Sequence, residues 1–481
     1  MTQSLIRIYA IALPALVALS SAGAQAGKAT PPTKQAPAQQ AAPKETPPAP
    51  GPAKNFRLPP RKTFALANGM TVTMVPFGII PKVTMVLNLR TGVIDEGPND
   101  VTLASVVADM LLEGTTTRSA LDISRQAAEM GGSVSASWGS EVSNVSGEAL
   151  AENASKLAAL IADVTLHPKF APEDLKRIID KHARDNAIAL ARPDNVAMKT
   201  FREVMYGNHP FARIYPSDSM LRGFTVERVK TFHTTNFSAK RAHLYISGVF
   251  DQSAVEKAVR DAFSGWAAGA PPTENPPKIA AKQQVALIDR PKSVQSAMLM
   301  GVAAPSPSSP DWVAMNVADA LLGGAFGSRI TANIREDKGY TYSPYSFLFT
   351  RRGATIWTEG ADVTTNVTGA SLTEIFKEVE RLRAETPPEQ ELAGIKSFLA
   401  GTFTISNSNR GGVINQLGFV DLHGLGDEYI TNYVKNVLAV KPTDVRAVAE
   451  KYIDPKKMSI AIVGDKKLVD PQLGKSKAIV P

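Results

Sequence analysis

The sequence predicts an α+β fold that is built twice, each half being a mostly antiparallel sheet packed with helices. Two observations lead to this prediction. Expected helices and hairpin strands are mixed instead of strictly alternating, which is typical of helices packed on an antiparallel sheet. In addition, a proline-rich break at residues 268–282 divides the chain into two parts with the same order of elements. Gene duplication is the simplest account of this repeat, and chance similarity of two patterns is the alternative.

The hydrophobic periodicity justifies the elements one by one. Each part opens with a strand and then an apolar helix that stops at a glycine: 82–90, 101–112 and Gly114; then 294–302, 312–322 and Gly323. Two amphipathic helices follow in each part: 153–166 and 172–190; then 371–384 and 389–401. A strand closes each part, within 237–248 and within 453–464. The two parts therefore have equivalent elements throughout.

Length and composition exclude several classes of protein. A chain of 481 residues predicts two or more domains. The absence of cysteine excludes disulfide scaffolds, cysteine-ligated zinc, iron–sulfur clusters and thiol nucleophiles. Of the net charge of +8, residues 1–60 carry +5, and basic residues elsewhere alternate with acidic ones. Nucleic acid is therefore not an expected partner.

The N-terminal residues predict export. Arg7 precedes an apolar run that ends in small residues near Ala26, so residues 1–26 are expected to be a cleaved signal peptide and the mature protein to be periplasmic, without a membrane anchor. Residues 27–60 contain ten prolines and predict a disordered tether. The remaining chain is divided into an N-terminal domain, a linker and a C-terminal domain: 61–267, 268–282 and 283–475.

Three segments carry a family resemblance. Leu322–Ser346, which reads LGGAFGSRITANIREDKGYTYSPYS, resembles the second-half signature of the insulinase/pitrilysin family of zinc peptidases. Leu66–Val75 is similar to the opening strand of that family, and Met110–Thr115 is similar to the stretch after its zinc motif. The resemblance covers roughly residues 61–475 and implies that the two halves form a clamshell around a closed chamber.

The zinc motif of this family is missing. Active members carry H-x-x-E-H, in which two histidines on one helix face bind zinc and the glutamate polarises the metal-bound water. The equivalent residues are Ser105, Ala108 and Asp109, and the third ligand of the family falls at Asp185, or one helical turn away. Carboxylates without imidazoles are poor zinc ligands, so we expect no catalytic metal in this chain.

No other catalytic site replaces the missing motif. The histidines stand at 167, 182, 209, 233, 243 and 423, without an i, i+4 pair. His182 could share a helix face with Asp185, although an exposed residue or a carboxylate partner is the ordinary interpretation. There is no G-x-S-x-G elbow, and the segment Gly323–Ser328 lacks the lysine of a phosphate loop.

The second half keeps the residues that face the zinc in the family. Arg335 and Tyr342 match an arginine and a tyrosine seven residues apart, with Gly339 between the helix and a strand expected near Tyr340. The resemblance implies that Tyr342 donates its hydroxyl to the oxyanion at the scissile carbonyl, while Arg335 holds the substrate backbone. The alternative is a surface arginine beside Glu336 and a half-buried strand tyrosine.

Two further features bear on substrate binding. Gly323, Gly324 and Gly327 either let a loop approach the backbone of a substrate or simply end a helix. Ser133–Trp138 looks like the edge strand to which family members add unfolded peptide, although the missing zinc motif beside it leaves peptide binding there open.

The resemblance leads to one principal hypothesis and two alternatives. The chain is expected to be the non-metal subunit of a heterodimeric zinc metallopeptidase, inactive alone, with Arg335 and Tyr342 completing the site of a zinc-bearing homologous partner that cleaves unfolded peptides. The first alternative is a catalytically inert peptide-binding or scaffolding protein of the same fold. The second is a zinc peptidase with substitute ligands in this chain.

Overall fold

The computed structural model describes residues 56–272 and 274–474. The predicted signal peptide and most of the predicted tether lie outside these residues. At the end of the tether segment, the Phe56 ring packs edge-on against Phe403 at a centroid distance of 5.5 Å. Within the described ranges, no helix combines the length and the apolar character needed to cross a membrane.

The first sheet has six strands. They are β1 (Lys62–Ala65), β2 (Thr71–Pro76), β3 (Lys82–Leu89), β4 (Ser133–Ser137), β5 (Ser143–Leu150) and β6 (Ala242–Gly248), in the order β1-β2-β6-β3-β5-β4. Only β2 and β6 pair in parallel; the other pairs are antiparallel. The segment that resembles a peptide-binding edge, β4, is the terminal strand of this sheet.

The second sheet repeats this order. Its strands are β7 (Val285–Asp289), β8 (Gln295–Ala304), β9 (Tyr345–Arg351), β10 (Ala354–Thr364) and β11 (Ser459–Gly464), in the order β7-β11-β8-β10-β9. The closing strand β11 pairs in parallel with β7, as β6 pairs with β2. Apart from the additional β1, each strand has a counterpart in the other sheet. The predicted fold class, two α+β halves with mostly antiparallel sheets, is confirmed.

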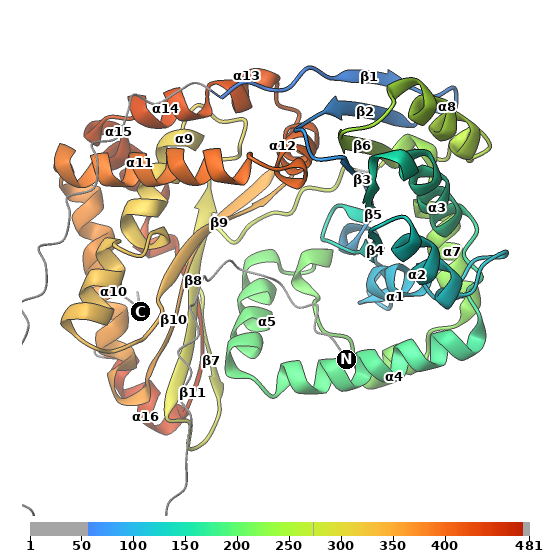
Figure 1. Ribbon diagram of the computed structural model, residues 1–481. Coiled ribbons are helices and arrows are strands. Elements are labelled where there is room, and N and C mark those ends of the chain that lie inside the picture. Colours follow the sequence, from blue (N-terminus) through green and yellow to red (C-terminus); the bar gives the residue numbers. More distant parts are fainter. Residues whose placement is uncertain (1–55, 273, 475–481) are drawn as a thin grey trace, which may run out of the picture. The chain divides into compact units, whose positions relative to one another are not determined.

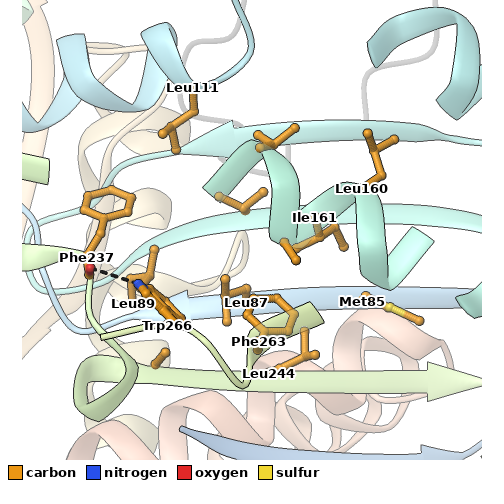
Figure 2. Packing of buried hydrophobic residues seen from close by; sticks show 14 of the residues in the cluster. Met85, Leu87, Leu89, Leu111, Leu160, Ile161, Phe237, Leu244, Phe263 and Trp266 are labelled. Atoms are coloured by element: carbon orange, nitrogen blue, oxygen red, sulfur yellow. Dashed lines mark hydrogen bonds between the residues drawn. The ribbon is translucent and has the colours of Figure 1, made fainter. Parts of the chain in front are cut away.

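Helices of the first half cover its sheet. They are α1 (Leu103–Leu111), α2 (Ala120–Glu129), α3 (Ala154–Leu166), α4 (Pro172–Leu190), α5 (Pro193–Tyr206), α6 (Asp218–Arg222), α7 (Val226–Asn236) and α8 (Gln252–Phe263). Alternate residues of β3 form the centre of the core, where Met85, Leu87 and Leu89 are fully buried. Figure 2 shows these side chains in a row below Ile161 of α3, with Leu89 next to Trp266, whose indole N–H donates to the Phe237 carbonyl oxygen at 3.2 Å.

The second half contains the remaining helices. They are α9 (Trp312–Asp319), α10 (Thr368–Ala384), α11 (Glu389–Ser406), α12 (Arg410–His423), α13 (Asp427–Thr431), α14 (Tyr433–Ala439), α15 (Pro442–Tyr452) and α16 (Lys466–Leu473). Two π-helical segments, Ala320–Gly324 and Thr331–Asp337, separate α9 from β9. The helix that starts at Trp312 therefore changes its winding after Asp319 and ends one residue beyond Gly323.

Two helices cross from one half to the other. The apolar face of α5, which includes Phe201 and Met205, packs on β8 and β11 of the second sheet. In return, α12 packs on β3 and β6 of the first sheet, where it covers Val75 and Tyr245. Each sheet thus takes part of its cover from the other half of the sequence.

The strand expected near Tyr340 begins later. After Gly339, which has a positive φ of 63°, the chain makes one isolated bridge at Thr341 and enters β9 only at Tyr345. Pro344 has no backbone N–H to donate to a strand ladder, which accounts for the late start.

Candidate functional site

The positions of the missing zinc motif lie on α1, against α4. Ser105 and Ala108 are each only 2% exposed, so neither presents a group to a cavity. Asp109 points to α4, where its Oδ2 lies 3.0 Å from Nε2 of His182 and 3.8 Å from Nζ of Lys181. At the place where the family resemblance implies a metal site, α1 and α4 are therefore joined by an ion-paired contact.

Asp185 does not join this contact directly. Its carboxylate accepts from Lys181 at 3.1 Å, one helical turn back along α4, and its side chain is 58% exposed. One helical turn before Asp185, the alternative position of the third ligand, stand Lys181 and His182. Lys181 therefore bridges the two carboxylates at Asp109 and Asp185.

These residues do not fit a zinc ion. They offer one carboxylate and one imidazole next to an ammonium group, while zinc sites in proteins use three or four nitrogen, sulfur or oxygen ligands. A lysine 3.8 Å from the carboxylate oxygen also repels a divalent cation. Across residues 56–272 and 274–474, no group of three or more His, Cys, Asp or Glu side chains is arranged to hold a metal ion.

A buried carboxylate fixes the start of α1. Glu96 is 4% exposed and accepts hydrogen bonds from the backbone N–H groups of Thr102 (3.1 Å) and Ala104 (2.9 Å). This interaction satisfies two donors at the helix N-terminus, where Thr102 has a left-handed backbone with φ of 79°. Burial raises the pKa of Glu96 to about 8. The role of Glu96 is to position α1.

The segment that carries Arg335 is anchored on two helices. The Asn333 amide donates to Glu374 and Glu378 of α10 at 2.9 and 2.8 Å. Arg329, two residues before the segment, forms a bidentate pair with Glu391 of α11, with both N···O distances 2.8 Å, and this hydrogen bonding lowers the pKa of Glu391. Such anchoring keeps the backbone of Arg335 in one position.

Arg335 and Tyr342 lie side by side at the surface. The guanidinium carbon of Arg335 lies 5.4 Å from the centroid of the Tyr342 ring and 4.6 Å from that of Phe326, and its Nε is 3.2 Å from the Glu336 carboxylate. Tyr342 is 85% exposed and Phe326 76%. The residues Phe326, Arg335 and Tyr342 are called the Arg–Tyr cluster below.

Sequence reasoning missed Phe326. Its aromatic side chain stands between Gly324 and Gly327, where no hydrophobic periodicity calls for a large apolar residue. The signal that could have found it is an aromatic residue in a glycine-rich loop just before the arginine. The alternative interpretation of Tyr342, a half-buried strand tyrosine, is not observed, because the residue precedes β9 and is exposed.

The three glycines differ in their surroundings. A Cβ on Gly323 would lie 2.4 Å from Oε2 of Glu359 and 2.7 Å from Oγ of Ser346, so this residue must be glycine for packing reasons. A Cβ on Gly324 would lie 2.9 Å from Oδ2 of Asp319, whereas one on Gly327 would meet nothing within 4 Å. Close packing beneath the loop explains Gly323, and substrate binding by any of the three stays a prediction.

Two carboxyl groups are buried beneath this loop. Oδ1 of Asp319 accepts from Ser346 Oγ at 2.6 Å and from Trp357 Nε1 at 2.8 Å. Glu359 is 0% exposed, and neither of its carboxylate oxygens has a hydrogen-bond partner within the described part of the chain. Burial raises the pKa of Asp319 to about 6 and, together with Asp319, raises that of Glu359 well above its usual value.

The Arg–Tyr cluster can stabilise negative charge but cannot attack a peptide bond. A phenol hydroxyl and a guanidinium are hydrogen-bond donors suited to an oxyanion or a peptide carbonyl. Within the described residues, the Tyr342 hydroxyl makes no hydrogen bond that would occupy it. A hydrolytic reaction at this cluster would need its nucleophile from another source.

Solved structures define the class of fold. The chain superimposes on a peptidase M16 inactive domain from Pseudomonas fluorescens with a TM-score of 0.78 and 21% identity, covering 84% of this chain and 98% of that one. It also superimposes on a protease from Helicobacter pylori with a TM-score of 0.79 and 17% identity, covering 85% and 100% of the two chains. The fold is thus the two-half fold of the M16 peptidases.

Sequence comparisons identify the family. Residues 80–214 match the insulinase family, peptidase family M16, and residues 223–399 match the peptidase M16 inactive domain. An uncharacterized zinc protease of Mycobacterium tuberculosis is 23% identical over 422 residues, which cover 85% of this chain and 93% of that protein. The chain belongs to the insulinase (M16) family of peptidases, and the family resemblance seen in its sequence is confirmed.

Proposed function

We propose that this chain is the non-metal subunit of a heterodimeric zinc metallopeptidase and that its Arg–Tyr cluster completes the active site of a zinc-bearing homologue. One observation carries the proposal: the donor set on α1 and α4 does not fit zinc, while Arg335 stays adjacent to Tyr342, which is presented to solvent. The match of residues 223–399 to the M16 inactive domain supports it.

In this heterodimer the two chains have separate tasks. The partner would hold the zinc, which would supply polarisation of the scissile carbonyl and activation of a water molecule. Tyr342 donates its hydroxyl to the oxygen that becomes negative, and Arg335 binds a neighbouring carbonyl of the peptide backbone. A fixed donor in a site closed to water stabilises the developing charge strongly. Export to the periplasm by the N-terminal signal belongs to the same proposal.

The test is reconstitution with a homologue that has an intact H-x-x-E-H motif. Each chain is purified alone, and the two are then mixed and supplied with an internally quenched peptide. We expect cleavage by the mixture only, co-elution of the two chains in size-exclusion chromatography, and zinc in the partner alone by elemental analysis. Removal of the zinc with a chelator abolishes the activity.

A Tyr342→Phe substitution tests the role of the cluster. Loss of one oxyanion donor lowers kcat by about 10²- to 10³-fold, and the heterodimer still forms. Tyr452→Phe is the matched control. The Tyr452 hydroxyl, on α15, donates to Asp311 at 2.7 Å, and we expect its removal to leave cleavage unchanged. Full activity of the Tyr342→Phe heterodimer would show that Tyr342 does not complete the partner's active site. If the isolated chain bound stoichiometric zinc and cleaved peptides, it would not be a non-metal subunit.

A further inference from the structure

Arg202 and Arg351 are two neighbouring arginines without a carboxylate partner. Arg202 lies on α5, and Arg351 is the last residue of β9. Their guanidinium carbons lie 5.0 and 3.9 Å from the centroid of the same ring, Phe349. Among the residues that the structure describes, neither guanidinium forms an ion pair, and the one hydrogen bond made by Arg351 goes to the carbonyl oxygen of Thr350 at 2.7 Å.

Buried donors converge on this place without acceptors. The Nε atoms of Arg202 and Arg351 and the hydroxyl of Tyr206 are all inaccessible to solvent and have no hydrogen-bond partner within the described ranges. Tyr206 is itself only 4% exposed. Burial, followed by repulsion from Arg351, lowers the pKa of Arg202 to about 10. Unpaired buried donors and adjacent like charges each cost free energy, and a bound anion would offset the cost of the like charges.

Glu141, whose charge acts on Arg351, does not serve as that anion. The Glu141 carboxylate already accepts two hydrogen bonds from the backbone N–H of Arg352, at 3.0 and 3.1 Å. Burial raises the pKa of Glu141, although the neighbouring arginines act to lower it. The charge of Glu141 acts on Arg351, but within the described chain Glu141 forms no ion pair with Arg202 or Arg351.

A stripe of aromatic residues leads away from the two arginines. Tyr345, Phe347, Phe349 and Arg351 alternate along β9 and lie on one face of the strand. The ring centroids of successive aromatic residues are 6.0 Å apart in both steps. From Tyr345 to Arg351 the stripe extends about 20 Å, at about 3.3 Å for each residue of a strand.

The position of β9 in the sheet leaves one edge of the strand for a ligand. It is the terminal strand in the order of the second sheet, and Figure 1 shows it at that edge. In the first sheet the equivalent terminal strand is β4. An edge strand offers backbone N–H and C=O groups to an extended peptide, and its alternate side chains line the path of that peptide.

We propose that Arg202 and Arg351 bind a carboxylate of an extended peptide that lies along β9. The carboxylate accepts charge-assisted hydrogen bonds from both guanidinium groups. The aromatic stripe contacts the side chains that precede the carboxylate. This inference rests on the proposed function, because it takes the ligand to be a peptide. It adds that the chain prefers peptides with a negative charge at one end.

The test uses the isolated chain, which needs no partner to bind a peptide. Three fluorescently labelled heptapeptides of one sequence are compared by fluorescence anisotropy: a free acid, an amide, and an amide whose last residue is Glu. We expect the free acid to bind about tenfold or more tightly than the amide. The Glu-containing amide distinguishes a side-chain carboxylate from the terminal one as the preferred source.

Variants assign the preference to the two arginines. Arg202→Gln and Arg351→Gln each reduce binding of the free acid to the level of the amide, and Arg202→Lys restores part of the difference. Arg125→Gln, an equal loss of charge at an exposed ion pair on α2, leaves binding unchanged. The Tm of Arg202→Gln stays at or above that of the original chain, because no ion pair is lost.

Two results would overturn this inference. One is equal binding of acid and amide peptides, or no binding of either, by the unsubstituted chain. The other is an acid preference that survives both glutamine substitutions. Neither result depends on cleavage by the heterodimer, so failure of the proposed subunit function and failure of the carboxylate site can be told apart.

Discussion

Asp319 is a carboxyl group whose burial makes stability depend on pH. Because its pKa is raised to about 6 in the folded chain, the folded state binds the proton more tightly than the unfolded state does. The free energy of unfolding therefore falls as pH rises from about 4 to about 6, by up to about 3 kcal/mol, and stays lower above that range.

Asp319→Asn tests this effect. The amide oxygen can still accept from Ser346 and Trp357, while the buried charge is removed. We expect a higher Tm for the variant at about pH 7.5 and little difference at about pH 4, measured by circular dichroism. A variant that is equally destabilised at both pH values would show that the carboxylate stabilises the loop in its charged form.

Gly323 and Gly327 lie in the same loop, but only Gly323 is closely packed. Gly323→Ala places a methyl group 2.4 Å from the Glu359 carboxylate, so we expect a loss of about 1–3 kcal/mol in unfolding free energy. Gly327→Ala meets nothing and is expected to leave stability unchanged. Urea titration measures both. If the two alanine variants are equally stable, the close approach at Gly323 is not what requires glycine.

At the scale of elements, α5 lies in the first half of the sequence but stabilises the sheet of the second half. Phe201 is 3% exposed and lies in the cluster with Leu299 and Ile356 of the second sheet. Phe201→Ala is expected to cost about 3–5 kcal/mol, observed as a lower urea midpoint. Phe398→Ala on α11, where the ring is 48% exposed, is the control and should cost far less. Equal effects would mean that α5 is not a structural part of the second half.

Periodicity predicted the elements well because it reports burial. The helix expected at residues 172–190 is α4 with the same bounds, and the strand expected at 82–90 is β3 with one residue less. Periodicity does not report which surface covers an apolar face. The exchange of α5 and α12 between the halves was therefore not predictable, nor was the change to π-helical winding after Asp319.

The residues of the candidate site were predictable only where their spacing in the sequence matched that of the family. The family spacing led to Arg335 and Tyr342, which the structure places side by side. The pairing of Asp109 with His182 joins residues 73 positions apart, and no local pattern reports such a contact. Arg202 and Arg351 were also missed, because an arginine on a helix or at the end of a strand ordinarily lies in solvent, and only the fold shows that these two meet.

At the scale of the whole molecule, the exchanged helices join the two halves into one structure. On the first sheet, Asp421 of α12 accepts from Tyr245 and lies 2.8 Å from Nδ1 of His243. Burial acts to raise the pKa of Asp421, but hydrogen bonds from His243 and Tyr245 hold it below its usual value. The boundaries predicted from sequence, 61–267 and 283–475, separate each sheet from one of the helices that cover it.

This arrangement predicts that neither half folds normally by itself. Residues 56–267 expressed alone would expose Val75 and Tyr245, which are 0% and 1% exposed beneath α12. We expect such a fragment to bind a hydrophobic dye and to unfold without a cooperative transition, whereas residues 56–474 unfold in one transition. Urea unfolding followed by tryptophan fluorescence and by circular dichroism measures both. A fragment with a sharp transition and the midpoint of the whole chain would contradict the prediction, since α12 would then contribute nothing to the first sheet.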